Sequence, residues 1–155
     1  MNNIEIYGYI LDEHLFANTS VNPYNNGFCT PAANCLPAGV FNLTNCIQIG
    51  IFNAPIYMSL PHFLFGDPKL VADVDGLNPI FDKHKTIVFF EPLTGIPITG
   101  HKRVQLSTKL YRDPKVPFTM NLPEIYFPLF WLDEVNQIKN NFGIFFLFKM
   151  KSFNN

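Results

Sequence analysis

The sequence contains few charged residues and no excess of either sign. Charged residues make up 15% of the 155 positions, with 11 basic and 12 acidic side chains, whereas about 25% is usual for a soluble domain. The formal net charge of -1 provides no overall footprint for a nucleic-acid backbone or an anionic membrane surface, so polyanion binding is set aside. Because 48% of the residues are hydrophobic and 17 are phenylalanine, intrinsic disorder is excluded over most of the chain.

Long helices and membrane-spanning runs are also missing. The 13 prolines and 9 glycines recur from Pro23 to Pro128, and interior proline breaks a helix, so helical bundles and coiled coils are excluded. The longest apolar run, residues 142–148, is far below the ~20 residues that span a bilayer. Residues 1–5 carry an acidic side chain and no apolar run, so the start does not have the pattern of a secretory signal.

No catalytic signature is present. The sequence has no Gly-x-Ser-x-Gly, no glycine-rich phosphate loop and no His-Glu-x-x-His. His62 and Asp67 have the one spacing that suggests part of a metal site, but a metal needs three or four convergent ligands, so a structural His62 is favoured. The remaining histidines are scattered, and Asp73, Asp75 and Glu91 have no spacing that favours an acid/base pair. We therefore predict no enzymatic activity, no metal and no cofactor.

Cysteines and glycosylation sequons point to the secretory pathway. Three cysteines occur, at Cys29, Cys35 and Cys46, and two Asn-x-Ser/Thr sequons begin at Asn18 and Asn42. Both features also occur by chance in cytosolic proteins, so composition leaves the compartment open. Three cysteines allow three pairings with one thiol left over, and the odd thiol implies an intermolecular bond, a free thiol or a missing segment.

Hydrophobic patterning predicts a mainly β fold of antiparallel strands with one or two short helices. Asp67 and Pro68 are a cap and a first residue typical of a helix, which Gly76 can end. Residues 92–95 are typical of the turn of a hairpin. The expected strands are residues 4–11, 54–60, 85–91, 96–111 and 124–132.

The expected strands differ in how their apolar residues are distributed over the two faces. In the long strand, apolar and polar residues alternate between two faces, with Ile98, Val104, Leu106 and Leu110 on one and Arg103, Gln105, Ser107 and Lys109 on the other. Residues 87–90 and 126–131 are apolar throughout, so both of their faces need a cover. A second protein layer is the favoured cover and a bound apolar ligand is the alternative. Pro128 belongs at an edge or a bulge, and residues 135–155 have no period, no cap and no partner segment.

Six segments carry a family resemblance. They are GFCTPAANCLPAGVFNLTNC (27–46), APIYMSLPHF (54–63), DPKLVADVDGLNP (67–79), HKTIVFFEPLTGIPI (84–98), KRVQL (102–106) and FPLFWLDE (127–134). In unbroken order over residues 6–134, the chain resembles the class B scavenger receptor family. Residues 17–20 and 27–29 are most similar to its lysosomal integral membrane protein type two branch.

The resemblance implies a receptor and not an enzyme. Such a receptor has a glycosylated lumenal or extracellular domain between two membrane-spanning helices, and its antiparallel β-barrel core is pierced by an apolar tunnel for fatty acids, sterols and lipoprotein lipid. We expect a protein of the plasma membrane or of lysosomes and endosomes, with lipids or lipoproteins as partners. The lipid-tunnel candidates are Phe89, Val104, Leu106 and Leu110. The alternatives are a lysosomal sorting receptor for a lumenal hydrolase, or a truncated product without activity of its own.

The resemblance also assigns the cysteines and sequons by position. Cys29 and Cys35 match a family disulfide, and Cys46 matches a cysteine whose partner lies outside this chain. Asn42 stands where relatives can carry a sequon, and Asn18 matches one in the lysosomal branch. Both membrane helices and the first half of the family's ectodomain are absent. We therefore expect a fragment, with residues 1–134 as the C-terminal portion of the ectodomain and residues 135–155 as a divergent tail.

Overall fold

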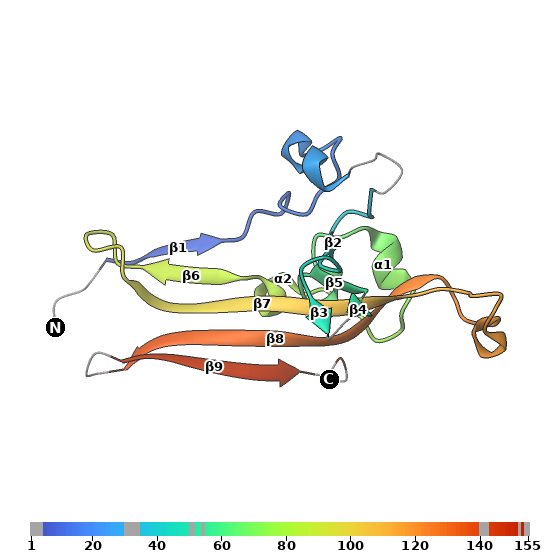
Figure 1. The fold of residues 1–155 in the computed structure, drawn as a ribbon. Coiled ribbons are helices and arrows are strands. Elements are labelled where there is room, and N and C mark those ends of the chain that lie inside the picture. The colour runs from blue at the N-terminus through green and yellow to red at the C-terminus, as the bar shows by residue number, and fades with distance from the viewer. Residues whose placement is uncertain are drawn as a thin grey trace.

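The computed structural model describes residues 5–29, 35–49, 52–53, 55–139, 143–151 and 153. They form a seven-stranded antiparallel sheet, a separate two-stranded ribbon and short helices (Figure 1). The strands are β1 (Tyr7–Ile10), β2 (Phe41–Asn42), β3 (Gln48–Ile49), β4 (Phe52–Asn53), β5 (Ile56–Ser59), β6 (Ile87–Phe90), β7 (Pro97–Leu110), β8 (Ile125–Lys139) and β9 (Gly143–Lys151). The helices are α1 (Pro68–Ala72) and α2 (Phe81–His84), with 3₁₀ turns η1 (Pro23–Phe28), η3 (Pro61–Phe63) and η4 (Pro117–Thr119). The predicted mainly β class is confirmed, and within the described residues the sheet is not closed into a barrel.

Strand β7 is the centre of the sheet. One of its edges pairs with β8 over almost its whole length, and β9 adds to the far edge of β8. The other edge of β7 pairs with β6 near its start and with β5 near its end. Strand β1 lies beyond β6, and β2 lies beyond β5. The other strands of this sheet therefore pair, directly or through a neighbour, with the two longest strands, β7 and β8.

The predicted hairpin and helix cap are confirmed. Strands β6 and β7 are joined by the turn at residues 92–95, where Gly95 has a φ of +69°, a conformation that suits glycine. The carboxylate of Glu91 accepts hydrogen bonds from the Thr94 hydroxyl and from the N–H groups of Leu93 and Thr94. Asp67 caps α1 by accepting a bond from Lys69 N at 2.9 Å, but the helix ends at Ala72 and not near Gly76.

Strand β8 differs from the prediction for residues 124–132. It continues to Lys139 and pairs with β9, so the segment after residue 134 has a partner that the sequence did not reveal. Pro128 lies at a register shift between β7 and β8, which confirms its expected place at a bulge. Strand pairing does not test the expected division of the chain after residue 134, because a divergent tail can also pair; that division stays a prediction.

The two faces of the sheet have unexpected polarities. Polar residues of β7 lie on the covered face, where η3 packs on the strand: Gln105 is 0% and Ser107 1% exposed. The apolar residues of the opposite face are only half-buried. We call this second face the open apolar face; the register places on it Met58, Val88, Val104, Leu106, Phe130 and Leu132. The layer beneath the covered face contains a small core of Val40, Phe63 and Leu70.

Candidate functional site

The open apolar face is the first candidate site. Val104 pairs with Leu132, and Leu106 pairs with Phe130 on one side and Met58 on the other. Side chains of paired residues share a face, so these five form one apolar surface across three strands. All five are half-buried. Apolar surface of this extent is normally covered, and this arrangement suits contact with an apolar molecule or another protein layer.

The structure does not place the four tunnel candidates on one wall. Val104, Leu106 and Leu110 alternate along β7 and share the open apolar face. Phe89 pairs with Thr99, which lies on the opposite face of β7 from Val104, and its ring covers Gly8 on β1. Sequence patterning could not predict this difference, because an apolar strand such as β6 does not indicate which of its faces points inward.

A buried polar contact holds the η3 segment against the covered face of the sheet. Gln105 accepts a hydrogen bond from the His62 backbone N–H at 2.7 Å and donates one to the Ser107 hydroxyl at 3.2 Å. The η3 segment needs this anchor, since His62, Phe63 and Phe65 all have positive φ values between 55° and 63°. Non-glycine residues adopt this region only where the surroundings hold them in it. Buried Gln105 therefore fixes a strained connection.

Two stacked imidazoles lie beside this clamp. The rings of His62 and His84 are parallel within 16°, with centroids 4.3 Å apart, and both contact the ring of Trp131 edge to face. His62 Nδ1 accepts a hydrogen bond from Asn78 N, and His84 Nδ1 accepts one from Ile80 N. Both rings are therefore neutral, with the proton on Nε2. Burial lowers the pKa of each ring, and nearby positive charge contributes to lowering that of His84 to about 4.

These contacts give His62 a structural role. Its Nδ1 is occupied by the Asn78 N–H, and Asp67 caps α1. Within the described ranges, no three His, Cys, Asp or Glu side chains are arranged to hold a metal ion. The rejected carboxylates also have local roles, since Asp73 pairs with Lys69 and Glu91 binds its own turn.

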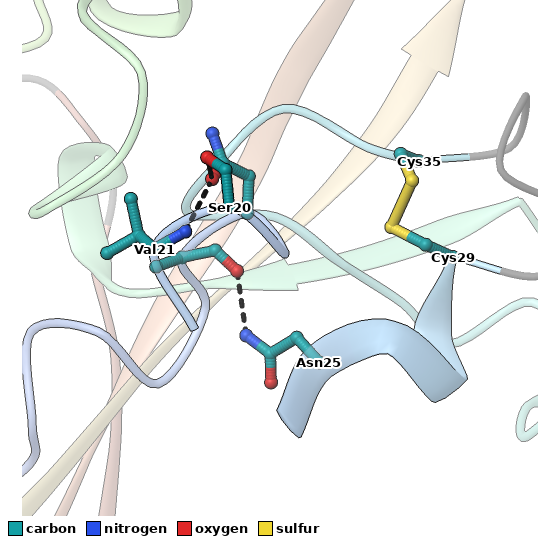
Figure 2. The surroundings of a disulfide bond; sticks show 7 residues. Ser20, Val21, Asn25, Cys29 and Cys35 are labelled. Atoms are coloured by element: carbon teal, nitrogen blue, oxygen red, sulfur yellow. Dashed lines mark hydrogen bonds between the residues drawn. A yellow bond between two sulfur atoms is a disulfide. The ribbon is translucent and has the colours of Figure 1, made fainter. Parts of the chain in front are cut away.

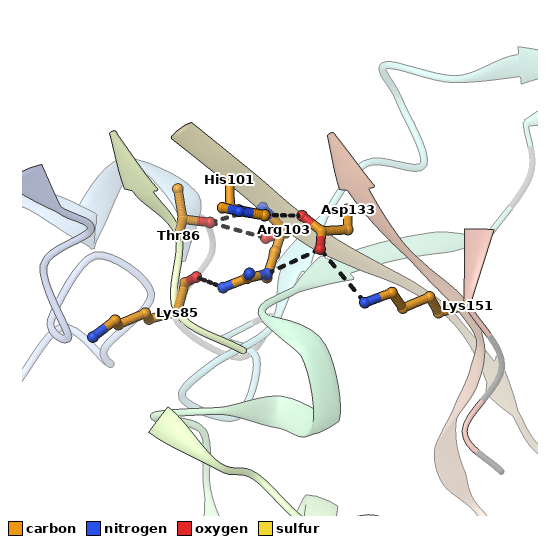
Figure 3. A network of polar contacts seen from close by, with 6 residues as sticks. All are labelled: Lys85, Thr86, His101, Arg103, Asp133 and Lys151. Atoms are coloured by element: carbon orange, nitrogen blue, oxygen red, sulfur yellow. Dashed lines mark hydrogen bonds and ion pairs between the residues drawn. The ribbon is translucent and has the colours of Figure 1, made fainter. Parts of the chain in front are cut away.

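A buried carboxylate gathers three basic side chains on the same covered face (Figure 3). Asp133 Oδ1 lies 2.9 Å from His101 Nδ1, and its Oδ2 lies 3.4 Å from Arg103 Nε and 3.5 Å from Lys151 Nζ. Arg103 also donates to the Lys85 carbonyl. Burial by itself raises the pKa of Asp133, but the His101 hydrogen bond and the charges of Arg103, His101 and Lys151 outweigh it and lower the pKa. This network joins β7, β8 and β9.

The disulfide and the sequons lie around a cavity at the edge of the fold. Cys29, at the end of η1, is bonded to Cys35 (Figure 2). Both sequon asparagines, Asn18 and Asn42, are exposed and line a cavity of about 400 Å³ next to this disulfide. Cys46 is a free, exposed thiol.

Removing the disulfide by the paired change Cys29→Ala and Cys35→Ala is expected to loosen η1. The bond closes a loop with a sequence separation of 6, and on the chain-entropy model a loop of this size contributes about 2 kcal/mol. Hydrogen exchange of residues 15–29 in the complete protein should accelerate by roughly thirtyfold. Cys46→Ala is the matched control. An equal acceleration of exchange in this variant would contradict the view that the disulfide holds η1 in place.

Comparison with known proteins places the chain in a family. A family model described as the CD36 family matches residues 1–153. The chain is 40% identical over 131 residues to sensory neuron membrane protein 1 of Plutella xylostella, a match that covers 84% of this chain and 23% of the relative. For the protein of the same name from Manduca sexta the identity is 38% over 125 residues, covering 81% and 22%, and for that from Apis mellifera it is 35% over 131 residues, covering 84% and 24%.

The chain thus spans about a quarter of the length of these relatives. None of the helices described in the structure has the length and apolar character needed to cross a membrane. The family match includes every strand that the structure describes, from β1 to β9. The resemblance to the class B scavenger receptors is thereby confirmed, and the chain belongs to the CD36 family.

Proposed function

We propose that this chain is part of a membrane-anchored class B scavenger receptor, and that its open apolar face forms part of the wall of a conduit that binds and transfers lipids. The observation that carries the proposal is the inverted polarity of β7 and β8. Polar Gln105 and Asp133 are buried on the covered face, while Val104, Leu106 and Leu132 remain half-buried on the other side.

The inversion has an energetic consequence. Apolar surface in water costs about 25 cal/mol per Å² relative to burial, so a broad apolar face is retained where something covers it. The covered face already has its own protein layer, held by Gln105 and the His62 backbone. The open apolar face is therefore the side available to an acyl chain or sterol, and the rigid clamp behind it keeps that wall in place.

The test places larger side chains on the open apolar face. In the complete protein, the paired change Val104→Trp and Leu106→Trp is expected to reduce lipid transfer from donor vesicles to cells by roughly tenfold, because two indole rings would occupy the space of the acyl chain. Surface expression, measured by flow cytometry, is expected to stay within about twofold. The matched control is Leu93→Trp in the β6–β7 turn, where the side chain is 94% exposed.

Two results would overturn the proposal. Unchanged lipid transfer with normal surface expression would show that the open apolar face does not line the conduit. Loss of surface expression in the paired variant but not in Leu93→Trp would show that another protein layer packs on this face. The two outcomes are separated because expression and transfer are measured on the same cells.

The compartment and the partners are further proposals. The relatives are named as sensory neuron membrane proteins, which supports placement in a membrane, and the Cys29–Cys35 disulfide supports an extracellular or lumenal side for this segment. We also propose glycosylation at Asn18 and Asn42 and, from the family resemblance, a partner for Cys46 outside this chain. The lysosome, lipoproteins and a lumenal hydrolase as partner stay predictions, as does the truncated product without activity.

A further inference from the structure

The long connection between β7 and β8 carries an exposed apolar cluster. We call residues 111–124 the β7–β8 tip; it projects beyond the end of the sheet as the orange loop in Figure 1. Phe118 is 83%, Tyr111 56% and Met120 55% exposed. Three large apolar side chains are thus exposed within one connection of 14 residues, numbered 111–124.

The tip is held in one shape by its polar residues. Thr119 Oγ1 donates toward the carbonyls of Asp113 and Val116, and it accepts a bond from Asp113 N at 2.9 Å. Arg112 Nε donates to the Leu122 carbonyl. Because these contacts satisfy the backbone from within, Phe118 and Met120 project outward. A preformed tip also loses little conformational entropy when it binds.

Two exposed cations flank the apolar side chains in the sequence. Arg112 and Lys115 are exposed on either side of Asp113, which is half-buried and accepts a bond from Lys115 N. The second carboxylate of the tip, Glu124, is exposed at its far end, next to β8. At the opposite end of the sheet, Leu93 is exposed beside Glu91, whose pKa is lowered by hydrogen bonds from the Thr94 hydroxyl and from the N–H groups of its own turn. Leu93 therefore has a carboxylate as its charged neighbour, whereas Phe118 has Lys115 three residues before it.

We propose that the β7–β8 tip inserts Phe118 and its apolar neighbours into the headgroup layer of the bilayer in which the complete protein is anchored. The proposal rests on the membrane anchoring in the proposed function. Aromatic residues suit this layer, and basic side chains beside them are attracted to anionic lipids. Such an insertion is weak by itself, but anchoring raises its effective concentration, so a few side chains are enough to orient the domain.

The experiment asks what Phe118 touches. The complete protein, with the photoreactive residue p-benzoylphenylalanine replacing Phe118, is reconstituted into vesicles of phosphatidylcholine and phosphatidylserine (4:1) that contain a clickable phosphatidylcholine, and illuminated. We expect lipid adducts at position 118. The same replacement at Leu93, which is more exposed than Phe118 but lies beside Glu91, is the matched control and should give at least roughly fivefold fewer adducts.

A second variant tests the charge. Arg112→Glu with Lys115→Glu should reduce the adducts at position 118 by roughly tenfold in vesicles with phosphatidylserine, and less in phosphatidylcholine alone. Adducts at position 118 with the protein's own chain, adducts equal to those at Leu93, or no lipid adducts would each overturn the proposal. Lipid transfer is measured on the same vesicles: failure of the tip with normal transfer overturns only the insertion, whereas lost transfer in the conduit variant concerns the proposed function.

Discussion

Replacing Asp133 by asparagine is expected to destabilise the central strand pair by about 3 kcal/mol, because the change leaves Arg103 buried without its carboxylate. The Arg103 side chain is 11% and the Asp133 side chain 5% exposed. Asparagine keeps the size of the side chain and an oxygen for the His101 contact, so the loss reports the negative charge. His101 and Lys151 add to the loss, since both lie within 3.5 Å of the same carboxylate.

The neighbouring residue provides a matched control. Glu134 points to the other face and pairs with Lys102 at 3.4 Å, but the Lys102 side chain is 64% exposed. Glu134→Gln should therefore cost less than about 1 kcal/mol, the range of surface ion pairs. Both changes remove one negative charge from adjacent positions of β8, and both carboxylates are largely buried, so the difference between the variants reports the burial of the basic partner, Arg103 against Lys102.

Hydrogen exchange in the complete protein measures both variants. A loss of about 3 kcal/mol accelerates exchange of the β7 and β8 amides by roughly a hundredfold where they exchange by opening of this pair. Equal acceleration in Asp133→Asn and Glu134→Gln would refute the buried-charge argument. No acceleration in either would show that β7 and β8 are held by contacts other than this network.

The sequence predicted the elements that are encoded by neighbouring residues. The turn at residues 92–95 and the Asp67 cap depend on local chemistry, and both are confirmed. The bulge at Pro128 is local as well, because proline cannot donate to a ladder. The second helix, α2, was harder to predict: it is a single turn, and its one buried residue, His84, is held by contacts with other segments.

The orientation of the sheet was beyond local patterning. Alternation along β7 separates Gln105 from Leu106, but it does not indicate which face is buried. Here the polar face is covered, because the Gln105 side chain accepts a hydrogen bond from the backbone N–H of His62 in η3. The two residues are 43 positions apart in the sequence. The network around Asp133 was missed for the same reason, since Arg103 and Asp133 become neighbours only through the register of β7 and β8.

Acidification is expected to weaken the covered layer through His62 and His84. In the folded state both Nδ1 atoms accept backbone N–H bonds, so protonation there would replace two hydrogen bonds by two repulsive contacts. The ordinary histidine pKa of 6.5 applies when the chain unfolds, whereas burial and neighbouring charge hold that of His84 at about 4. Between these two values the unfolded chain binds more protons, so stability falls as the pH decreases from about 6.5 toward 4.

Burial is the largest cause of the lowered pKa of His84, and charged neighbours on four elements add to it. His62 of η3, Arg103 of β7, Lys83 of α2 and Lys151 of β9 all contribute to lowering the pKa of His84. The lowered pKa of His84 sets an upper limit of about 3 kcal/mol on the stability lost in acid. Solvent screening at the edge of the histidine pair makes the loss smaller than this limit. The layer made by η3 and α2 should thus open before the β7–β8 ladder does.

His84→Gln isolates this effect, since the glutamine carbonyl can still accept the Ile80 N–H but does not titrate near neutral pH. Hydrogen exchange of residues 60–66 and 78–85 in the complete protein, corrected for the intrinsic effect of pH, should accelerate between pH 7 and 5 in the natural sequence. The acceleration should be several-fold smaller in His84→Gln. His14→Gln is the control, because the His14 side chain is 57% exposed. An identical pH dependence in all three proteins would show that the stacked pair does not titrate with folding, and the pH sensitivity would then belong to carboxylates such as Asp133.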